Sequence, residues 1–598
     1  MYAEKILVIA RDGTMARGDI LKKRLQVLEN RVRKKISPGV SLREWHSSIV
    51  LEGTVSSWAQ LYDAGKMCAN QGYKGVVNKL EVKDLEIPKI KKPQLADDFL
   101  QGKQVDVLVI GGGIIGCAIA RELAKWQLSI LLVEKEEDVA MHASSRNDGM
   151  IHPGIEPKIG SKKAIFNVKG NEMYTRVARE LDVKLIRCGS SVLFDSPLLK
   201  LVKPVLDIRA NKMGVKGISL LSREEALQKE PNIGVPIAGA VHFATTGIIS
   251  PYKMTVAYAE NAVQNGAEVS LNTVVLSMTK EHGRITSVKT NRGTVYPKVV
   301  INAAGTFADI IADMAGDQFF SIHPRKGEIL FLDKKKGELI NGVIGKPSLT
   351  QTKSNTKGGG VVKTVDGNVL VGPDAYEQPF REDFSTNMNN IEAIMQKHLP
   401  LIRGFSPADV IAYCAGIRAC TYEEDFIIER SEYVDNLVYA AGIQSPGLAS
   451  APAIAAEIER ITCKVLSEVM DVKPKQNWNP IRKGIPELSS MDFESRSKII
   501  KENPHYGEIV CRCEGISKGE IIAAIHSPIP VTSVDAIKRR VRAGMGRCQG
   551  GFCLPTVMTI INEETGIPMT SITKKGNDSN IVVAETKQNP TTGGEGVE

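Results

Sequence analysis

The segment from Val105 to Glu134 constrains the fold more than any other part of the chain. It begins with an apolar run that predicts a buried strand, continues with apolar residues at helical spacing, and ends in a second apolar run. Between the first strand and the helix lie three glycines in the pattern G-x-G-x-x-G, which permit a tight turn and close approach of a phosphate to bare backbone. A Rossmann-like dinucleotide-binding unit is therefore predicted, with the pyrophosphate at the helix N-terminus and the adenosine ribose at the final acid. Its binding residues are Gly111, Gly113, Gly116 and Glu134.

The length of 598 residues predicts several domains, because a single hydrophobic core stops growing beyond about 250–300 residues. The net charge of +9 favours anionic ligands or an acidic partner, but no basic stripe with interleaved aromatic residues indicates nucleic-acid binding. No apolar run reaches the roughly 18 residues of a membrane span, and the N-terminal segment lacks the cleavage site of a signal peptide. We therefore expect a cytoplasmic protein, and peripheral attachment to the inner face of the membrane stays open.

The cysteines are unevenly distributed. Six of the ten are scattered through core-like sequence and are expected to be buried, reduced thiols. The other four cluster near the C-terminus as a C-x-C pair and, after two segments with helical patterns, a C-x4-C pair in a glycine-rich loop. Four thiolates on short loops can bind zinc or a [2Fe-2S] cluster, although zinc sites more often use C-x2-C pairs. The predicted metal ligands are Cys511, Cys513, Cys548 and Cys553.

Residues 1–86 predict a small α/β unit with a strand at Ile6–Ala10, a basic helix at Ile20–Lys35, and further strands and a helix. The segments LEGTVSSWAQLYDAG and GYKGVVNKLEV resemble the small BON fold. This resemblance implies a docking or scaffold unit, and the unit carries no pair of acids placed for chemistry. Residues 87–103, which include a Pro- and Lys-rich stretch, predict a linker.

Between Gln104 and Leu466 the chain contains the segments GGGIIG, ASSRNDGMIHPGI, INAAGTFAD, HPRKGE, GNVLVGPDA, CAGIRA and AAGIQSPGL. Their order and spacing resemble the D-amino-acid oxidase-like FAD oxidoreductases, in particular the anaerobic glycerol-3-phosphate dehydrogenase and L-2-hydroxyglutarate oxidase branch. The resemblance implies α/β and α+β domains, FAD rather than NAD, and a β-sheet substrate domain that covers the flavin. The implied FAD-binding domain is discontinuous, with residues 104–190, 241–316 and 411–470, and the substrate domain comprises 191–240 and 317–410.

The segment NLVYAAGIQSPGL predicts a strand, a turn and the start of an alanine-rich helix. Free N–H groups at this helix N-terminus can stabilise the negative charge of a reduced flavin, although a purely structural helix is the alternative. The family resemblance implies further FAD contacts beyond the glycine loop and the ribose acid. These are Lys135, Ser145, Gly149, Val274, Val275, Ala304, Gly305, Gly442, Ser445, Gly447 and Leu448.

The segment DAIKRRVRAGMGRCQGGFC, taken with the cysteine spacing, resembles the bacterioferritin-associated ferredoxin domain found at the end of several flavoprotein dehydrogenases. It implies a [2Fe-2S] cluster in a small helical domain at residues 505–575, with zinc as the minor alternative. The basic residues among 538–547 either offset the negative charge of the cluster or form a solvated face. Residues 471–504 predict a linker, and residues 587–598 predict a disordered tail.

Oxidation of an alcohol requires an acceptor for the hydroxyl proton, and an anionic substrate requires fixed cations. His152 is the candidate base by residue type and family position, with a flavin-orienting or covalently attached histidine as the alternative. Arg418 in AGIRA is the first candidate cation, because related enzymes place an arginine there. The remaining candidates, each of which could instead form a structural ion pair, are Arg146, Arg325 and Lys326.

One departure from the family pattern bears on the substrate. Glycerol-3-phosphate dehydrogenases typically have an arginine for the phosphate shortly after the loop histidine, whereas this chain has Glu156. The domain combination still implies oxidation of sn-glycerol 3-phosphate to dihydroxyacetone phosphate, with a 2-hydroxy acid such as L-2-hydroxyglutarate nearly as well supported. Electrons would pass through the cluster to a partner protein or quinone-linked subunit, within an oligomer or hetero-complex. An electron-relay subunit without its own substrate and an amine or imino-acid dehydrogenase are the rival interpretations.

Overall fold

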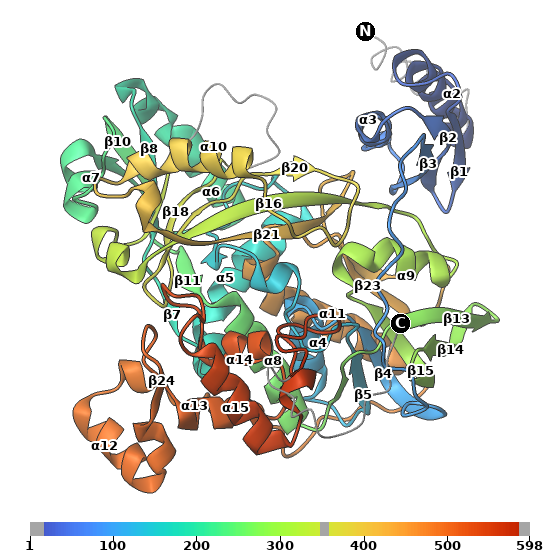
Figure 1. Ribbon diagram of the computed structural model, residues 1–598. Helices are drawn as coiled ribbons and strands as arrows, with labels where there is room; N and C mark the ends of the chain where they lie inside the picture. Colours follow the sequence, from blue (N-terminus) through green and yellow to red (C-terminus); the bar gives the residue numbers. More distant parts are fainter. Residues whose placement is uncertain (1–16, 347–357, 585–598) are drawn as a thin grey trace, which may run out of the picture.

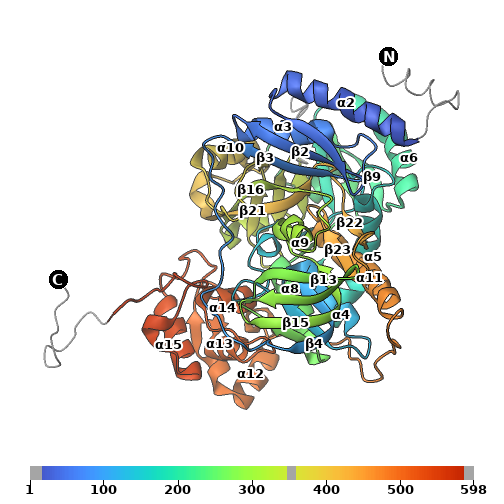
Figure 2. The ribbon, with the colours of Figure 1, turned by 90° about the vertical axis from the view of Figure 1, so that its right-hand side faces the viewer.

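The computed structural model describes residues 17–346 and 358–584. The chain forms a small N-terminal α/β unit, two central domains built on sheets, and a helical C-terminal unit (Figure 1). The N-terminal unit and the C-terminal helices lie at opposite ends of the molecule in both views (Figures 1 and 2). The strand predicted at Ile6–Ala10 and the tail predicted at 587–598 lie outside the described residues.

The dinucleotide-binding domain is built on the parallel strands β12, β5, β4, β15 and β23, in that order. Strands β4 (Lys103–Ile110) and β5 (Ile130–Val133) are joined by helix α4 (Ile114–Leu123), as the spacing predicts. Both strands are largely buried, because helices and an antiparallel extension cover the two faces of the sheet. The other elements are α8 (Pro251–Gln264), β12 (Glu268–Ser270), β13 (Val275–Glu281), β14 (Arg284–Thr290), β15 (Gly293–Asn302), α9 (Ala308–Met314), β22 (Ile427–Arg430), β23 (Leu437–Ala441) and α11 (Gly447–Leu466).

The second central domain is a mixed, mostly antiparallel sheet in the order β20-β16-β19-β18-β17-β8-β10-β9, with β21 also paired to β16. The long strands β16 (Ile322–Leu332) and β21 (Val410–Thr421) are antiparallel along their whole length. The remaining elements are β8 (Ser190–Phe194), α6 (Lys203–Met213), β9 (Ile218–Ser222), α7 (Arg223–Lys229), β10 (Gly239–Phe243), β17 (Val343–Gly345), β18 (Gly360–Lys363), β19 (Val369–Gly372), β20 (Tyr376–Glu377) and α10 (Met388–His398).

Two predicted boundaries differ from this sheet. The sequence places residue 411 onward in the FAD-binding domain, but β21 belongs to the substrate-side sheet because its backbone partner is β16. Strand β10 crosses the boundary predicted at residue 241, since it is held between β8 and β9. Between β12 and β13 the chain turns at Asn272, which has a left-handed φ of 50°. Pairing partners distant in sequence therefore decide these borders.

The polar segment at residues 143–164, which includes His152, contains a short strand, β6 (Met150–Ile151). This strand pairs with β11 (Gly247–Ile249), which also pairs with β7 (Leu185–Ile186), in a small sheet beside the two larger ones. Helix α5 (Lys162–Glu180) begins where the loop ends, and Ser161 caps it by accepting from the Ala164 N–H. The loop is thereby held at both ends.

The described part of the N-terminal unit has a three-stranded sheet with two helices and packs on the central domains. Tyr422, which follows β21, is buried in the hydrophobic core of this unit and accepts a hydrogen bond of 2.9 Å from the Asn78 side chain. The N-terminal unit therefore packs directly against the central domains and is not connected to them by the linker alone. Its elements are α2 (Arg17–Lys35), β1 (Ser41–Trp45), β2 (Ser48–Val55), α3 (Trp58–Cys68) and β3 (Val76–Val82).

The C-terminal unit has its own hydrophobic core, formed mainly by three helices. The segment predicted as a linker at 471–504 contains helix α12 (Phe493–Glu502). Asp492 is the N-cap of this helix, because its side chain accepts from the Ser495 N–H. Within the described residues, no helix is both long and apolar enough to cross a membrane. The other elements of the unit are β24 (Ile509–Cys511), β25 (Ile516–Ser517), α13 (Lys518–Ile525), α14 (Val534–Val541) and α15 (Leu554–Thr565).

Candidate active site

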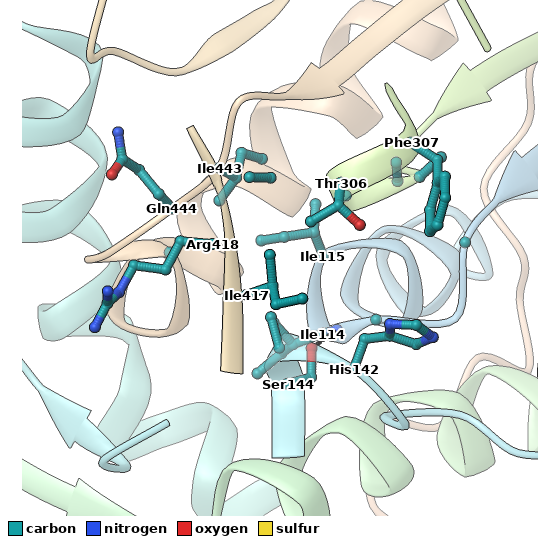
Figure 3. A pocket seen from close by; sticks show the side chains of 18 of the residues that line it. Ile114, Ile115, His142, Ser144, Thr306, Phe307, Ile417, Arg418, Ile443 and Gln444 are labelled. Carbon is teal, nitrogen blue, oxygen red and sulfur yellow. Dashed lines mark hydrogen bonds between the residues drawn. The ribbon is translucent and has the colours of Figure 1, made fainter. Parts of the chain in front are cut away.

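A cavity of about 290 Å³ lies where the C-terminal ends of the parallel strands meet the substrate-side sheet. This edge is where open α/β sheets bind ligands, because the strands end there and the following helices begin. Arg418 and Gln444 lie at one end of the cavity and His142 and Phe307 at the other (Figure 3). Apolar side chains occupy the space between them, namely Ile114, Ile115, Ile417 and Ile443.

The glycine loop has the geometry that its sequence requires. Gly111 has φ +113°, and a Cβ atom there would collide with the carbonyl group of Ala303. A Cβ atom on Gly116 would overlap the Gly111 carbonyl oxygen, so the glycine allows α4 to pack close to the strand. Gly116 itself does not line the cavity. Gly113 is the N-cap of α4 and lines the cavity. The free N–H groups of α4 therefore lie where a pyrophosphate would bind.

Glu134 follows β5 and is bonded to the glycine loop. Its carboxylate accepts from the Gly112 N–H at 2.5 Å and from the Glu136 N–H at 3.0 Å. Burial raises the pKa of this carboxyl above its ordinary value, and these N–H groups partly oppose the effect. Lys135, the next residue, forms ion pairs with Glu136 and Glu382 at the mouth of the same region. The acid thus holds the loop in place and also lines the cavity, as a ribose ligand must.

Most of the other predicted FAD contacts line the cavity. The exceptions, besides Gly116, are Ser145, Gly149 and Gly442. Ser144, rather than its predicted neighbour, lines the cavity and accepts a hydrogen bond of 2.9 Å from the Ile114 N–H at the start of α4. Two adjacent serines look alike in sequence, so only the backbone direction distinguishes them. The predicted residues that do line the cavity include Lys135, Val274, Val275, Ala304, Gly305, Ser445, Gly447 and Leu448.

The alanine-rich helix α11 begins at Gly447, beside the cavity. No side chain caps its N-terminus. The Gly447 N–H donates to the Gln444 carbonyl at 2.7 Å, so the N–H groups of the next two residues are the ones left for a ligand. Gln444 in the preceding turn is oriented by two neighbours: its carbonyl accepts from Arg325 at 3.1 Å, and its amide donates to Glu424 at 2.7 Å. The turn before α11 is therefore fixed by a partly buried polar network.

The four predicted cations have different environments. Arg325 is neutralised by Glu377 at 2.6 Å and by Glu424, and Lys326 pairs with Asp383 at 3.0 Å, so neither lines the cavity. Both residues lie on β16, where adjacent side chains point to opposite faces of the sheet. Arg146 lines the cavity but stacks on Phe384 at 4.1 Å and donates to the Met141 carbonyl. A structural role therefore explains Arg325 and Lys326 as placed.

Arg418, like Arg146, forms no ion pair with a carboxylate among the described residues, whereas Arg325 and Lys326 do. Arg418 lines the cavity from β21, and its guanidinium donates to the backbone carbonyls of Asp374 at 3.1 Å and Lys326 at 3.4 Å. Among the described residues, no carboxylate forms an ion pair with it. Burial lowers the pKa of Arg418, as expected for a cation that lacks a direct counter-ion. An anionic ligand in the cavity would supply that missing charge.

His152 lies in the wall of the cavity and is 7% exposed. Its backbone carbonyl accepts from the side chains of Asn167 and Asn171, both at 2.8 Å, which fixes the start of the loop. Nδ1 lies 3.8 Å from a carboxylate oxygen of Glu156, so the residue that departs from the family pattern is a neighbour of the histidine. The loop thus brings an imidazole and a carboxylate to the same wall.

The four C-terminal cysteines converge from two loops. Cys513 and Cys548 are exposed with their sulfur atoms 3.6 Å apart, whereas Cys511 and Cys553 are buried. N–H groups of the loop that follows Cys548, first that of Phe552, lower the pKa of the Cys548 thiol. Among the described residues, no three of these cysteines have sulfur atoms all within 4.8 Å of one another, whereas tetrahedral zinc would need roughly 3.8 Å between all four. Two separated pairs fit a two-iron cluster better than a single zinc ion.

Comparison with protein families identifies this combination of sites. A family model described as FAD dependent oxidoreductase matches residues 106–460, more than half of the chain. The chain belongs to the FAD-dependent oxidoreductases. A second family model, the BFD-like [2Fe-2S] binding domain, matches residues 509–563 and includes all four cysteines. The predicted family, FAD and the [2Fe-2S] domain are thereby confirmed for this flavoenzyme.

Individual relatives of the flavoenzyme agree with the predicted branch. The chain is 39% identical to the glycerol 3-phosphate dehydrogenase of Caloramator mitchellensis over 81% of this chain and 99% of the relative. It is 22% identical to a subunit of the anaerobic glycerol-3-phosphate dehydrogenase of Escherichia coli K12, over 75% of this chain and 86% of that relative. The FAD-bound L-alpha-glycerophosphate oxidase of Mycoplasma pneumoniae superposes with a TM-score of 0.58 and 27% identity, covering 64% of this chain and 98% of the oxidase. The resemblance of the N-terminal unit to the BON fold stays a prediction.

Proposed function

We propose that this flavoenzyme oxidises sn-glycerol 3-phosphate to dihydroxyacetone phosphate and passes the electrons through its [2Fe-2S] domain to a partner protein or quinone-linked subunit. The choice of an anionic substrate rests on Arg418, a half-buried cation in the cavity wall without a carboxylate ion pair among the described residues. The 39% identity to a glycerol 3-phosphate dehydrogenase over nearly the whole relative supports the named substrate.

The protein residues would divide the work as follows. Arg418 binds the anionic group of the substrate, and its planar guanidinium suits phosphate or carboxylate. His152 accepts the hydroxyl proton, with Glu156 at 3.8 Å stabilising the imidazolium that forms. FAD, when bound, supplies the two-electron acceptor for the substrate hydride. The N-terminus of α11, near Gln444, stabilises negative charge on that acceptor.

A 2-hydroxy acid is the second candidate, and Glu156 is the observation that favours it. A carboxylate this close to the candidate base would repel a phosphate dianion more than a monoanionic carboxylate group. The L-2-hydroxyglutarate dehydrogenase of Escherichia coli K12 is 29% identical over 49% of this chain and 72% of its own length, a smaller share than for the first candidate. The two substrates can be separated directly by experiment.

The deciding experiment is anaerobic addition of a substrate panel while flavin absorbance is followed. We expect glycerol 3-phosphate to bleach the flavin. Bleaching by L-2-hydroxyglutarate alone would select the second candidate, and bleaching by N-methyl amino acids would select amine oxidation. If only NADH or a reduced partner protein bleaches it, the chain is an electron relay.

A variant pair tests the proposed base. His152→Ala should slow flavin reduction by about 100-fold or more at saturating substrate, because the hydroxyl proton loses its acceptor. His142→Ala, at the end of the cavity opposite Arg418, is the matched control and should leave that rate unchanged when FAD is in excess. Unchanged reduction in His152→Ala would remove the proposed role.

We also propose that the protein works in the cytoplasm, attached to a partner at the inner face of the membrane. Helix α2 is rich in lysine and arginine and lies on the outer side of the N-terminal unit (Figure 2). These charges support binding of this unit to an acidic partner or to an anionic membrane surface. The relation to a dehydrogenase subunit supports a partner protein. Co-sedimentation with anionic but not with neutral vesicles, lost when the α2 charges are replaced, would show attachment to lipid. No sedimentation with either vesicle would leave the partner protein as the means of attachment.

A further inference from the structure

Three arginines near the cluster ligands are buried between domains instead of facing solvent or the cluster. Arg539 and Arg540 lie on α14, which packs beside α8 of the FAD-binding domain (Figure 1). Both guanidinium groups bind the carboxylate of Asp138, with N–O distances of 2.8–3.1 Å. Asp138 is fully buried, although it lies some 400 residues earlier in the chain. This ion-pair set joins the cysteine domain to the dinucleotide-binding domain.

Arg542, the third arginine, connects three other parts of the chain. Its Nε donates to Glu514 at 3.0 Å, and Glu514 directly follows the cluster ligand Cys513. Nη1 donates to Tyr252 at 2.9 Å and to Asp366 at 3.0 Å. Nη2 donates to Asn368 at 2.8 Å. One buried guanidinium thus ties the ligand loop to the start of α8 and to the turn between β18 and β19.

The position of Asp138 extends this contact toward the cofactor. It lies four residues after the ribose acid Glu134, and Ala140 N in the same loop donates to the Gly112 carbonyl at 3.0 Å. One loop therefore contacts the glycine loop on one side and α14 on the other. A buried charge must keep its partners, because loss of one partner leaves the other charged group without solvent or counter-ion.

We propose that Arg539, Arg540 and Arg542, with Asp138, Glu514 and Asp366, form an interdomain clamp that holds the [2Fe-2S] domain in one orientation against the FAD-binding domain of the same chain. The clamp makes these arginines positioning residues for electron transfer within one chain, and it excludes a domain that swings between two sites. The electron route rests on the proposed function. Each substrate molecule gives its hydride to FAD and a proton to solvent, and two one-electron oxidants such as ferricyanide then remove the two electrons, with release of the second proton.

The test compares three variants of the full holoprotein. Arg542→Gln and Asp138→Asn each remove one half of the clamp. Arg542→Lys keeps the charge but loses the planar guanidinium and its several donors. His526→Ala is the control, since this ring is 56% exposed and pairs with Glu564 within the C-terminal unit. Trypsin cleavage in residues 471–504 reports release of the domain, and rapid-freeze EPR after substrate addition reports reduction of the cluster.

We expect Arg542→Gln and Asp138→Asn to accelerate cleavage and to slow cluster reduction by about tenfold or more, with flavin bleaching unchanged within about twofold. The control should match the wild type in both readouts, and added sucrose should slow cluster reduction in the clamp variants only. Equal cleavage in all proteins, or viscosity-dependent cluster reduction in the wild type, would overturn the proposal. If glycerol 3-phosphate fails to bleach the flavin, the proposed function fails, but cleavage and reduction by dithionite still test the clamp. If Arg542→Gln does not fold, Arg542→Lys gives the same comparison at smaller amplitude.

Discussion

Replacement of Arg418 by Gln should remove most of the affinity for an anionic substrate. The register of β16 and β21 places Arg418 directly opposite Arg325. Arg325 is neutralised by Glu377 and Glu424, whereas Arg418 donates only to carbonyl groups among the described residues. Arg418 therefore offers positive charge to a ligand at the Gln444 end of the cavity, and Arg146 also lines the cavity without a carboxylate ion pair among the described residues.

The magnitude follows from charge separation and burial. Two unit charges 4 Å apart interact by about 4 kcal/mol at an effective dielectric constant of about 20, and truncation of one partner in a buried pair costs about 2–5 kcal/mol. Since each 1.4 kcal/mol corresponds to tenfold, the Kd for substrate should rise by roughly 30-fold to 1,000-fold or more. Arg418→Lys keeps the charge but loses one hydrogen bond, so its Kd should rise only about tenfold.

Anaerobic titration of flavin bleaching measures these constants. Glycerol, which lacks the phosphate, is the matched control ligand, and its weak binding should be unaffected by Arg418→Gln. FAD content should also be unchanged. A Kd for glycerol 3-phosphate within about threefold of the wild type, or an equal loss for glycerol, would refute the assignment of Arg418 as the anion site.

Three further predictions concern cofactors and stability. Glu134→Gln should weaken FAD binding by about tenfold, because the amide cannot accept as strongly from the Gly112 and Glu136 N–H groups, and equilibrium dialysis of FAD measures this. Cys553→Ser should abolish iron incorporation and lower the unfolding temperature of the C-terminal unit while FAD content stays normal, as iron analysis and calorimetry would show. Burial raises the pKa of Glu423 to about 7 from an ordinary 4.5, so its protonated form stabilises the fold below pH 4.5 and this contribution is lost as the pH rises through 7. The free energy of unfolding of Glu423→Gln, measured with denaturant, should therefore exceed that of the wild type by about 1–3 kcal/mol at pH 8 and equal it at pH 4.5. Equal stability of the two proteins at pH 8 would contradict the assignment.

Local spacing makes some features predictable from sequence. Gly116 is required by short-range geometry, because a Cβ atom there would overlap the carbonyl oxygen of Gly111, five residues earlier. Cys511 and Cys513 are recognisable for a similar reason, since two thiols one residue apart in a turn can approach one cluster. In both cases the constraint acts within one turn of the chain, where sequence order and spatial order agree.

Partners distant in sequence are not predictable in this way. Arg325 is a candidate substrate cation by sequence, but Glu377 and Glu424 neutralise it, and neither acid is recognisable as its partner from spacing. Arg540 is expected either to offset the charge of the cluster or to face solvent, yet it is buried against Asp138. An arginine has the same appearance in sequence whether it is paired or free, and only the fold decides which one remains available.

The same reasoning explains why the outer units matter to a site that they do not line. Strand β21 carries Arg418 into the cavity and ends beside Tyr422, which is buried in the core of the N-terminal unit. Strand β16 pairs with β19, and the turn before β19 contains the Asp366 and Asn368 that bind Arg542. The two strands behind the anion site are therefore braced at one end by the N-terminal unit and at the other through the clamp. A cation held at a fixed position binds an anion more tightly than a mobile one. The flanking units therefore affect substrate affinity by holding these two strands, without adding any chemical group to the cavity.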